Sequence, residues 1–163
     1  MELCYDWVDI MGNFIMQRIT KIKEAASHIQ QEAHGVQDIK DIINSLHTFV
    51  QYHIRTIEID VVKYEEELDP QSIMTLYFYQ GRFVELKYVL EYMQRRVFIH
   101  AVTFSRDSLL QLCRSVQTVM QDIDDVNRKT TQLYACPIRD ELFNFIYRSK
   151  KRVEEVITLL SKN

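Results

Sequence analysis

The feature that most constrains the fold is a heptad-like spacing of apolar residues, which restarts about five times along the chain. In the clearest stretch the apolar positions step by alternating fours and threes: Ile15, Ile19, Ile22, Ala26, Ile29 and Ala33. This spacing keeps one apolar stripe on one side of a helix. With only 3 Gly and 2 Pro in 163 residues, the chain has little of the turn chemistry that a sheet protein needs. The pattern therefore predicts helices that pack against one another.

The apolar stripes divide the chain into helical segments of about 3–33, 36–68, 70–104, 105–133 and 137–160. Glycine commonly ends helices, aspartate before proline is a common helix start, and serine is a common N-cap. The boundaries expected on these grounds are His34-Gly35, Asp69-Pro70, Ser105 and Cys136-Pro137. We therefore predict an all-α fold, an elongated up-and-down bundle of four to five long antiparallel helices with coiled-coil-like packing. A single domain is expected over residues 1–163.

As a pattern, this spacing resembles that of many helical-bundle families, vinculin-like and syntaxin-like modules among them. No motif here carries site residues over from any of them. An elongated dimer, in which two chains complete one bundle, is an alternative arrangement of the same stripes.

Charge and cysteine content narrow the classes of function. The formal net charge is −3, so the chain has no overall basic field for nucleic acid, and no nucleic-acid partner is expected. Residues 1–70 hold 6 Lys and Arg against 13 Asp and Glu, whereas residues 71–163 hold 14 against 10. We interpret this asymmetry as attraction within the bundle. Cys4, Cys113 and Cys136 match neither a disulfide framework nor a zinc motif. Together with the lack of a signal-like or membrane-spanning segment, they predict a soluble cytoplasmic protein.

The sequence contains no recognisable catalytic or metal-binding motif. A di-iron bundle needs Glu-x-x-His pairs, and a zinc protease needs histidines at i and i+4. Neither spacing occurs among the five histidines, which are His28, His34, His47, His53 and His100. Glycine-rich phosphate loops are also missing. We expect a protein that is not an enzyme and has no cofactor or metal, with a helical-bundle enzyme or metal carrier as the least favoured alternative.

The segment over residues 70–104 is the most apolar and carries a second stripe beside the expected one. Such a wide apolar arc belongs either to a central helix or to a helix that contacts a second molecule. Aromatic residues supply much of the contact energy of interfaces, because each removes a large apolar area from water. The candidate partner interface consists of Tyr77, Tyr79, Val84, Tyr88, Tyr92 and Ile99.

A basic run near the C-terminal end is the second candidate site, for anions or anionic lipid: Arg148, Lys150, Lys151 and Arg152. Its four charges point in several directions around a helix, which is more typical of a solvated face. We therefore predict a protein–protein interaction, scaffolding or adaptor module that acts through its helix faces and self-associates, with a homodimer as one form. A peripheral membrane protein that binds anionic lipid is the alternative.

Overall fold

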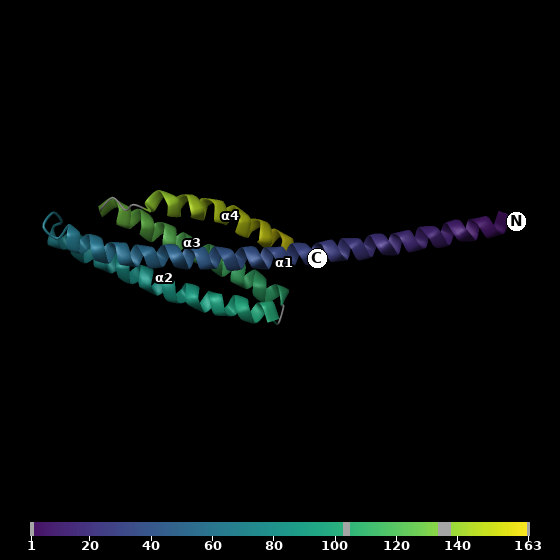
Figure 1. The fold of residues 1–163 in the computed structure, drawn as a ribbon, viewed down its shortest axis with the longest axis horizontal. Coiled ribbons are helices and arrows are strands. Elements are labelled where there is room, and N and C mark those ends of the chain that lie inside the picture. Colours follow the sequence, from purple (N-terminus) through teal and green to yellow (C-terminus); the bar gives the residue numbers. More distant parts are fainter. Residues whose placement is uncertain (1, 103–104, 134–137, 163) are drawn as a thin grey trace. The chain divides into compact units, whose positions relative to one another are not determined.

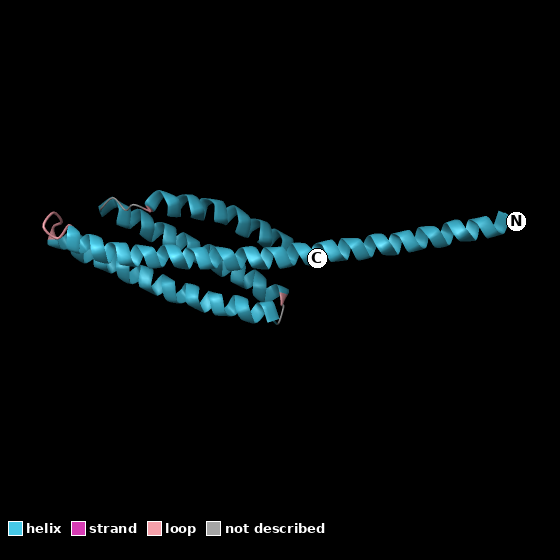
Figure 2. Ribbon diagram, in the orientation of Figure 1, coloured by secondary structure: helices cyan, strands magenta, loops and turns pink. Residues whose placement is uncertain are grey.

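The computed structural model describes the backbone of residues 2–102, 105–133 and 138–162, and side chains within 6–97, 105–133 and 138–162. The described chain forms four helices, α1 (Glu2–Lys63), α2 (Pro70–Val102), α3 (Arg106–Leu133) and α4 (Arg139–Ser161). Figure 2 shows helices joined by short connections and no strand in this described part. The protein is an all-α helical bundle, as the apolar spacing predicts.

The expected helix end at His34-Gly35 is wrong, because α1 continues through it to Lys63. A terminal glycine acts by adopting the left-handed conformation, and no described glycine has a positive φ angle. Glycine inside a helix costs only about 1 kcal/mol relative to alanine, and helix-compatible residues continue on both sides. The first two predicted segments therefore form one helix, and the described chain has four helices, within the predicted four to five.

The start of α2 is the one expected from its sequence. The Asp69 carboxylate accepts hydrogen bonds from the Ser72 backbone N–H (2.8 Å) and the Ser72 hydroxyl (2.9 Å). These bonds lower the pKa of Asp69, and Pro70 occupies the first helical position, where no N–H is needed. At Ser105 the backbone carbonyl accepts from Leu109 N–H at 3.0 Å, so α3 also begins where predicted. The Cys136-Pro137 boundary lies outside the described residues, and α4 begins at Arg139.

The chain divides into two compact units, Met1–Gly35 and Val36–Asn163. We call them the N-terminal unit and the bundle unit. The predicted single domain over residues 1–163 stays a prediction.

In the bundle unit, residues 36–63 of α1 pack with α2, α3 and α4, which lie side by side in Figure 1. Side-chain contacts between neighbouring helices show in which directions the helices run. His47 lies against Glu91 and Gln80 against the Ile54 carbonyl, so α1 and α2 are antiparallel. Lys150 reaches Gln121 and Arg128 lies over Phe143, so α3 and α4 are antiparallel as well.

The core of the bundle unit consists of the predicted stripes of all four helices. Burial of these side chains supplies the main favourable free energy of folding. The largest fully buried side chains are Phe83, Ile39, Ile43, Leu46, Ile57, Leu76, Leu90, Leu109, Met120, Ile123, Leu142 and Ile146.

The N-terminal unit is a helix whose apolar side chains are exposed. Ile15, Ile22 and Ile29 leave 51%, 68% and 65% of their surface accessible. The sequence prediction treats this stripe as the buried face of a bundle helix, and in this respect the exposure of its side chains differs from the expectation. The apolar core takes its α1 residues from 36–63.

Candidate interaction surface

The predicted partner interface on α2 is divided by the fold into an exposed and a half-buried part. Tyr77, Tyr88 and Tyr92 are 47%, 63% and 56% exposed. Tyr79 and Val84 are half-buried, and Tyr79 packs against the hydrophobic core. The side chain of Ile99 lies outside the described residues. Three of the six candidates therefore point to solvent.

These tyrosines belong to a larger apolar surface that runs along α2 opposite its buried stripe. We call it the α2 outer face, and its members are Met74, Tyr77, Phe78, Tyr88, Val89 and Tyr92. Phe78 is 65% exposed, and its ring meets that of Tyr79 edge-on at a centroid distance of 5.6 Å. From Met74 to Tyr92 the face extends about 27 Å at 1.5 Å per residue.

Sequence reasoning missed Met74 and Val89 as members of this face. Their positions follow the same alternation of threes and fours as the tyrosines, but Gly81 and Glu85 interrupt that row. Only the position of the core shows which of the two apolar stripes of α2 is buried. Phe83, Leu86 and Leu90 belong to the buried stripe.

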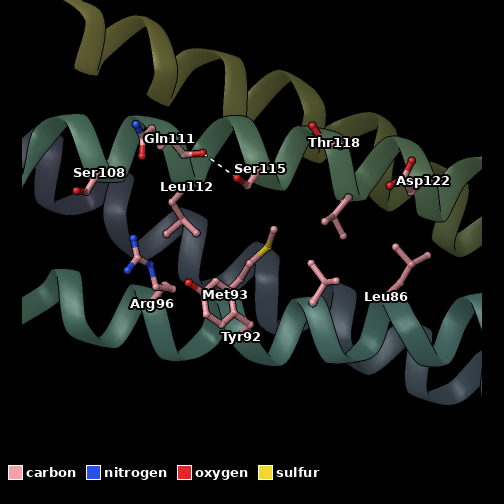
Figure 3. A pocket seen from close by; sticks show the side chains of 12 residues that line it. Leu86, Tyr92, Met93, Arg96, Ser108, Gln111, Leu112, Ser115, Thr118 and Asp122 are labelled. Atoms are coloured by element: carbon pink, nitrogen blue, oxygen red, sulfur yellow. Dashed lines mark hydrogen bonds between the residues drawn. The ribbon is translucent and has the colours of Figure 1, made fainter.

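A groove of about 500 Å³ lies between α2 and α3, next to the outer face. Leu86, Met93, Leu112 and Val119, all buried, supply apolar surface to the groove. Val89 and Tyr92 belong both to the groove and to the α2 outer face, so the two surfaces are continuous. Figure 3 shows Leu112 and Met93 facing each other from opposite helices.

The α3 side of this groove carries short polar residues, Ser108, Gln111, Ser115, Thr118 and Asp122. Figure 3 places Arg96 near one end of the groove and Asp122 at the other. The Arg96 guanidinium lies 6.0 Å from the centre of the Tyr92 ring, within the range of a cation–π contact. The groove is therefore apolar inside and carries opposite charges at its two ends.

The four basic residues of α4 do not share one environment. Arg152 binds the carboxylates of Asp38 and Glu155, and hydrogen bonds to Glu155 and Asp38 raise the pKa of its guanidinium. The Lys150 ammonium lies 3.3 Å from the Gln121 side-chain oxygen of α3. Arg148 and Lys151 are exposed. Arg152 thus joins the acidic first part of the chain to the basic last part, as the charge asymmetry suggests.

Two of the buried titratable side chains of the bundle unit, His53 and Cys113, have strongly shifted pKa values. Burial lowers the pKa of His53 to about 4, and its ring stacks on Phe83 at a centroid distance of 4.9 Å. Burial raises the pKa of the Cys113 thiol to about 12, which keeps it protonated at neutral pH and makes it a poor nucleophile. Both groups are uncharged at pH 7, as their apolar surroundings require. The side chains of Cys4 and Cys136 lie outside the described residues.

The possible metal ligands and the apolar character of the helices concern the alternative functions, a metal carrier and a membrane protein. Among the described side chains, no group of three or more His, Cys, Asp or Glu residues lies close enough to hold a metal ion. His47 contacts Glu91 at 3.1 Å across α1 and α2, and the Lys87 ammonium lies 3.9 Å from the same Glu91 oxygen. A search of the described residues finds no helix with both the length and the apolar character to cross a membrane.

Comparison with known proteins provides no assignment of function, so the function has to be inferred from the geometry of this surface. No family model matches the chain, and no curated protein or solved structure shows a significant match to it.

Proposed function

We propose that the protein is an interaction or scaffolding module that binds a partner protein on the α2 outer face and the adjoining α2–α3 groove, and that it self-associates. The observation that carries the proposal is the exposure of aromatic side chains along one face of α2, in two groups at Tyr77–Phe78 and at Tyr88–Tyr92. Tyr77, Phe78, Tyr88 and Tyr92 expose roughly half of their surface each. At about 150–250 Å² per aromatic side chain they present roughly 400 Å², in the range of patches that mark interaction sites.

The groove indicates the kind of partner segment. Two packed helices form a channel in which a third amphipathic helix can place its apolar side chains. Val89 and Tyr92 offer the exposed apolar contacts, above the nearly buried Leu86, Met93 and Leu112. Arg96 favours an acidic group on the partner at one end and Asp122 a basic group at the other, which would select one orientation of the bound helix.

The alternative, a lipid-binding surface on α4, has weaker support. Two of its four cations, Lys150 and Arg152, already have protein partners, which leaves Arg148 and Lys151 on the exposed surface. Stable binding to anionic lipid takes a larger cluster, of about four to eight basic residues. Sedimentation with anionic liposomes at low and high salt tests this alternative, and binding that survives Lys150→Glu with Lys151→Glu would reject this patch.

The main experiment compares variants in affinity capture of partner proteins by the full chain, followed by titration of the identified partner. Tyr88→Ala and Tyr92→Ala are each expected to weaken the complex about tenfold or more, because truncation of a buried interface aromatic costs more than about 1.4 kcal/mol. Tyr147→Ala is the matched control, because Tyr147 is 74% exposed but lies on α4. Equal affinities for all three variants, with thermal unfolding unchanged, would contradict the α2 surface.

A further inference from the structure

The N-terminal unit carries the largest exposed apolar surface among the described residues. Its large apolar side chains expose between 40% and 70% of their surface: Trp7, Val8, Ile10, Met11, Phe14, Ile15, Met16, Ile19, Ile22 and Ile29. Without Trp7, Ile10 and Phe14, which lie outside the stripe, the other seven amount to roughly 700 Å² at about 100 Å² each, close to the about 800 Å² per partner of a standard protein interface. A second copy of the same helix offers an equal surface.

We propose that the N-terminal unit pairs with the N-terminal unit of a second copy of this chain, as two antiparallel helices. The inference rests on the proposed self-association and assigns it to residues 7–29. Its basis is the arrangement of large, small and charged residues along the stripe, which favours one orientation of the two copies.

The stripe consists of two rows that each repeat every seven residues. One row holds large residues, Val8, Ile15, Ile22 and Ile29, and the other holds Gly12, Ile19, Ala26 and Ala33. In a parallel pair each row faces itself, so Gly12 and the alanines would meet their own copies and leave voids. In an antiparallel pair each row faces the other. Gly12 then lies opposite Ile22 of the second copy and Ala26 opposite Val8, with Ile15 and Ile19 at the centre.

The space around Gly12 agrees with this packing. A Cβ atom built on Gly12 meets no atom within 4 Å, so the helix surface at this point is open. A large side chain from a second helix can therefore approach the backbone closely there.

Charge favours the same orientation. Asp9 and Lys23 flank the row of large residues, and the antiparallel register brings Asp9 of each copy opposite Lys23 of the other, twice per pair. A parallel pair would instead bring Arg18 next to Lys23 twice. An antiparallel pair brings Arg18 next to Arg18 of the other copy only once. The Arg18 guanidinium lies 5.7 Å from the centre of the Phe14 ring of its own helix, so this aromatic ring is close to its charge.

The first test is the molar mass of the full chain in solution, by light scattering or sedimentation equilibrium. The 19.5 kDa chain is expected to form a dimer. Ile15→Asp with Ile22→Asp should give a monomer whose bundle unfolds at an unchanged temperature. Asn13→Asp with Gln17→Asp, which adds the same charges on the opposite side of the helix, should leave the mass unchanged.

The second test determines orientation by disulfide trapping in a Cys4→Ser, Cys136→Ser background. Val8→Cys with Ala26→Cys is expected to give a covalent dimer linked between positions 8 and 26. These positions lie about 27 Å apart within one helix, so the link can form only between copies. Val8→Cys alone should stay unlinked, whereas a parallel pair would link it.

Charge reversal sharpens the second test. Lys23→Glu should weaken the dimer several-fold at low salt, and adding Asp9→Lys should restore it.

The outcomes separate this inference from the proposed function. A dimer that survives Ile15→Asp with Ile22→Asp, or that links through Val8→Cys alone, overturns the antiparallel pair but leaves self-association standing. A monomer at every concentration overturns both the pair and self-association. A monomer that instead binds neutral vesicles through residues 7–29 also overturns the pair, because lipid is then the occupant of the stripe. None of these results changes the expectation that Tyr88→Ala weakens binding of the partner protein.

Discussion

Ile22 and Ile43 are the same residue type at equivalent places in the same kind of apolar stripe, one in the N-terminal unit and one in the bundle unit. Ile43 is fully buried, whereas Ile22 is 68% exposed. The difference shows that an apolar stripe predicts an apolar helix face without determining whether the rest of the chain buries it. In the bundle unit α2, α3 and α4 lie within reach, and the N-terminal unit requires a second molecule under the proposal made above.

Substitution of these two isoleucines should give the largest contrast. Ile43→Ala removes a fully buried side chain and is expected to lower the free energy of unfolding by about 2–5 kcal/mol, since lost burial and the resulting cavity add. Ile22→Ala should change it by less than about 0.5 kcal/mol. Urea unfolding at protein concentrations below the association range measures both. Equal losses would mean that residues 7–29 pack within the same molecule.

Protonation of His53 should destabilise the bundle unit alone. Its pKa is about 4 in the folded chain, against an ordinary value of 6.5, so the unfolded chain binds the proton more tightly. Stability is therefore complete above pH 6.5 and falls as the pH drops toward 4, by up to about 3 kcal/mol.

Urea unfolding between pH 7 and pH 4 measures this dependence, with His53→Phe as the comparison variant. The aromatic ring of phenylalanine can stack on Phe83 but cannot take up a proton. If the two proteins lose stability in parallel, His53 is not the group that titrates.

Substitutions at Gly12 and Gly81, one helical glycine from each unit, should show the smallest effects and again separate the units. A Cβ added at Gly12 or Gly81 meets nothing within 4 Å, so alanine fits at both without strain. Each substitution removes a helix-propensity cost of about 0.5–1 kcal/mol. Gly81→Ala should raise the free energy of bundle unfolding by that amount.

Gly12→Ala should instead increase helix content by circular dichroism without raising bundle stability. A rise in bundle stability from Gly12→Ala would show that the N-terminal unit unfolds together with the bundle.

Several parts of the fold follow from local sequence alone. The Asp69-Pro70 start of α2 is predictable because capping is decided by residues within one turn. The buried stripes of α3 and α4 are predictable as well, since each of these helices has one apolar side. Gly35 was misinterpreted because its effect depends on the conformation it adopts, and a glycine is equally able to remain helical.

Less of the candidate site than of the fold could be predicted from the sequence. Tyr79 and Tyr88 both belong to the wide apolar arc of α2, and the identity of the residues does not show which one turns toward the core. Likewise, nothing in the run from Arg148 to Arg152 indicates that Arg152 pairs with Asp38, a residue 114 positions earlier. Both answers depend on which helices become neighbours.

The sequence by itself determined that this protein is helical and which faces of α3 and α4 are apolar, because backbone periodicity and side-chain hydrophobicity act over one or two turns. Only the tertiary structure decided which of the apolar stripes close a core and which remain on the surface. The core of the bundle unit is formed by residues 36–63 of α1, α2, α3 and α4, whereas the equally apolar stripe of the N-terminal unit has exposed side chains.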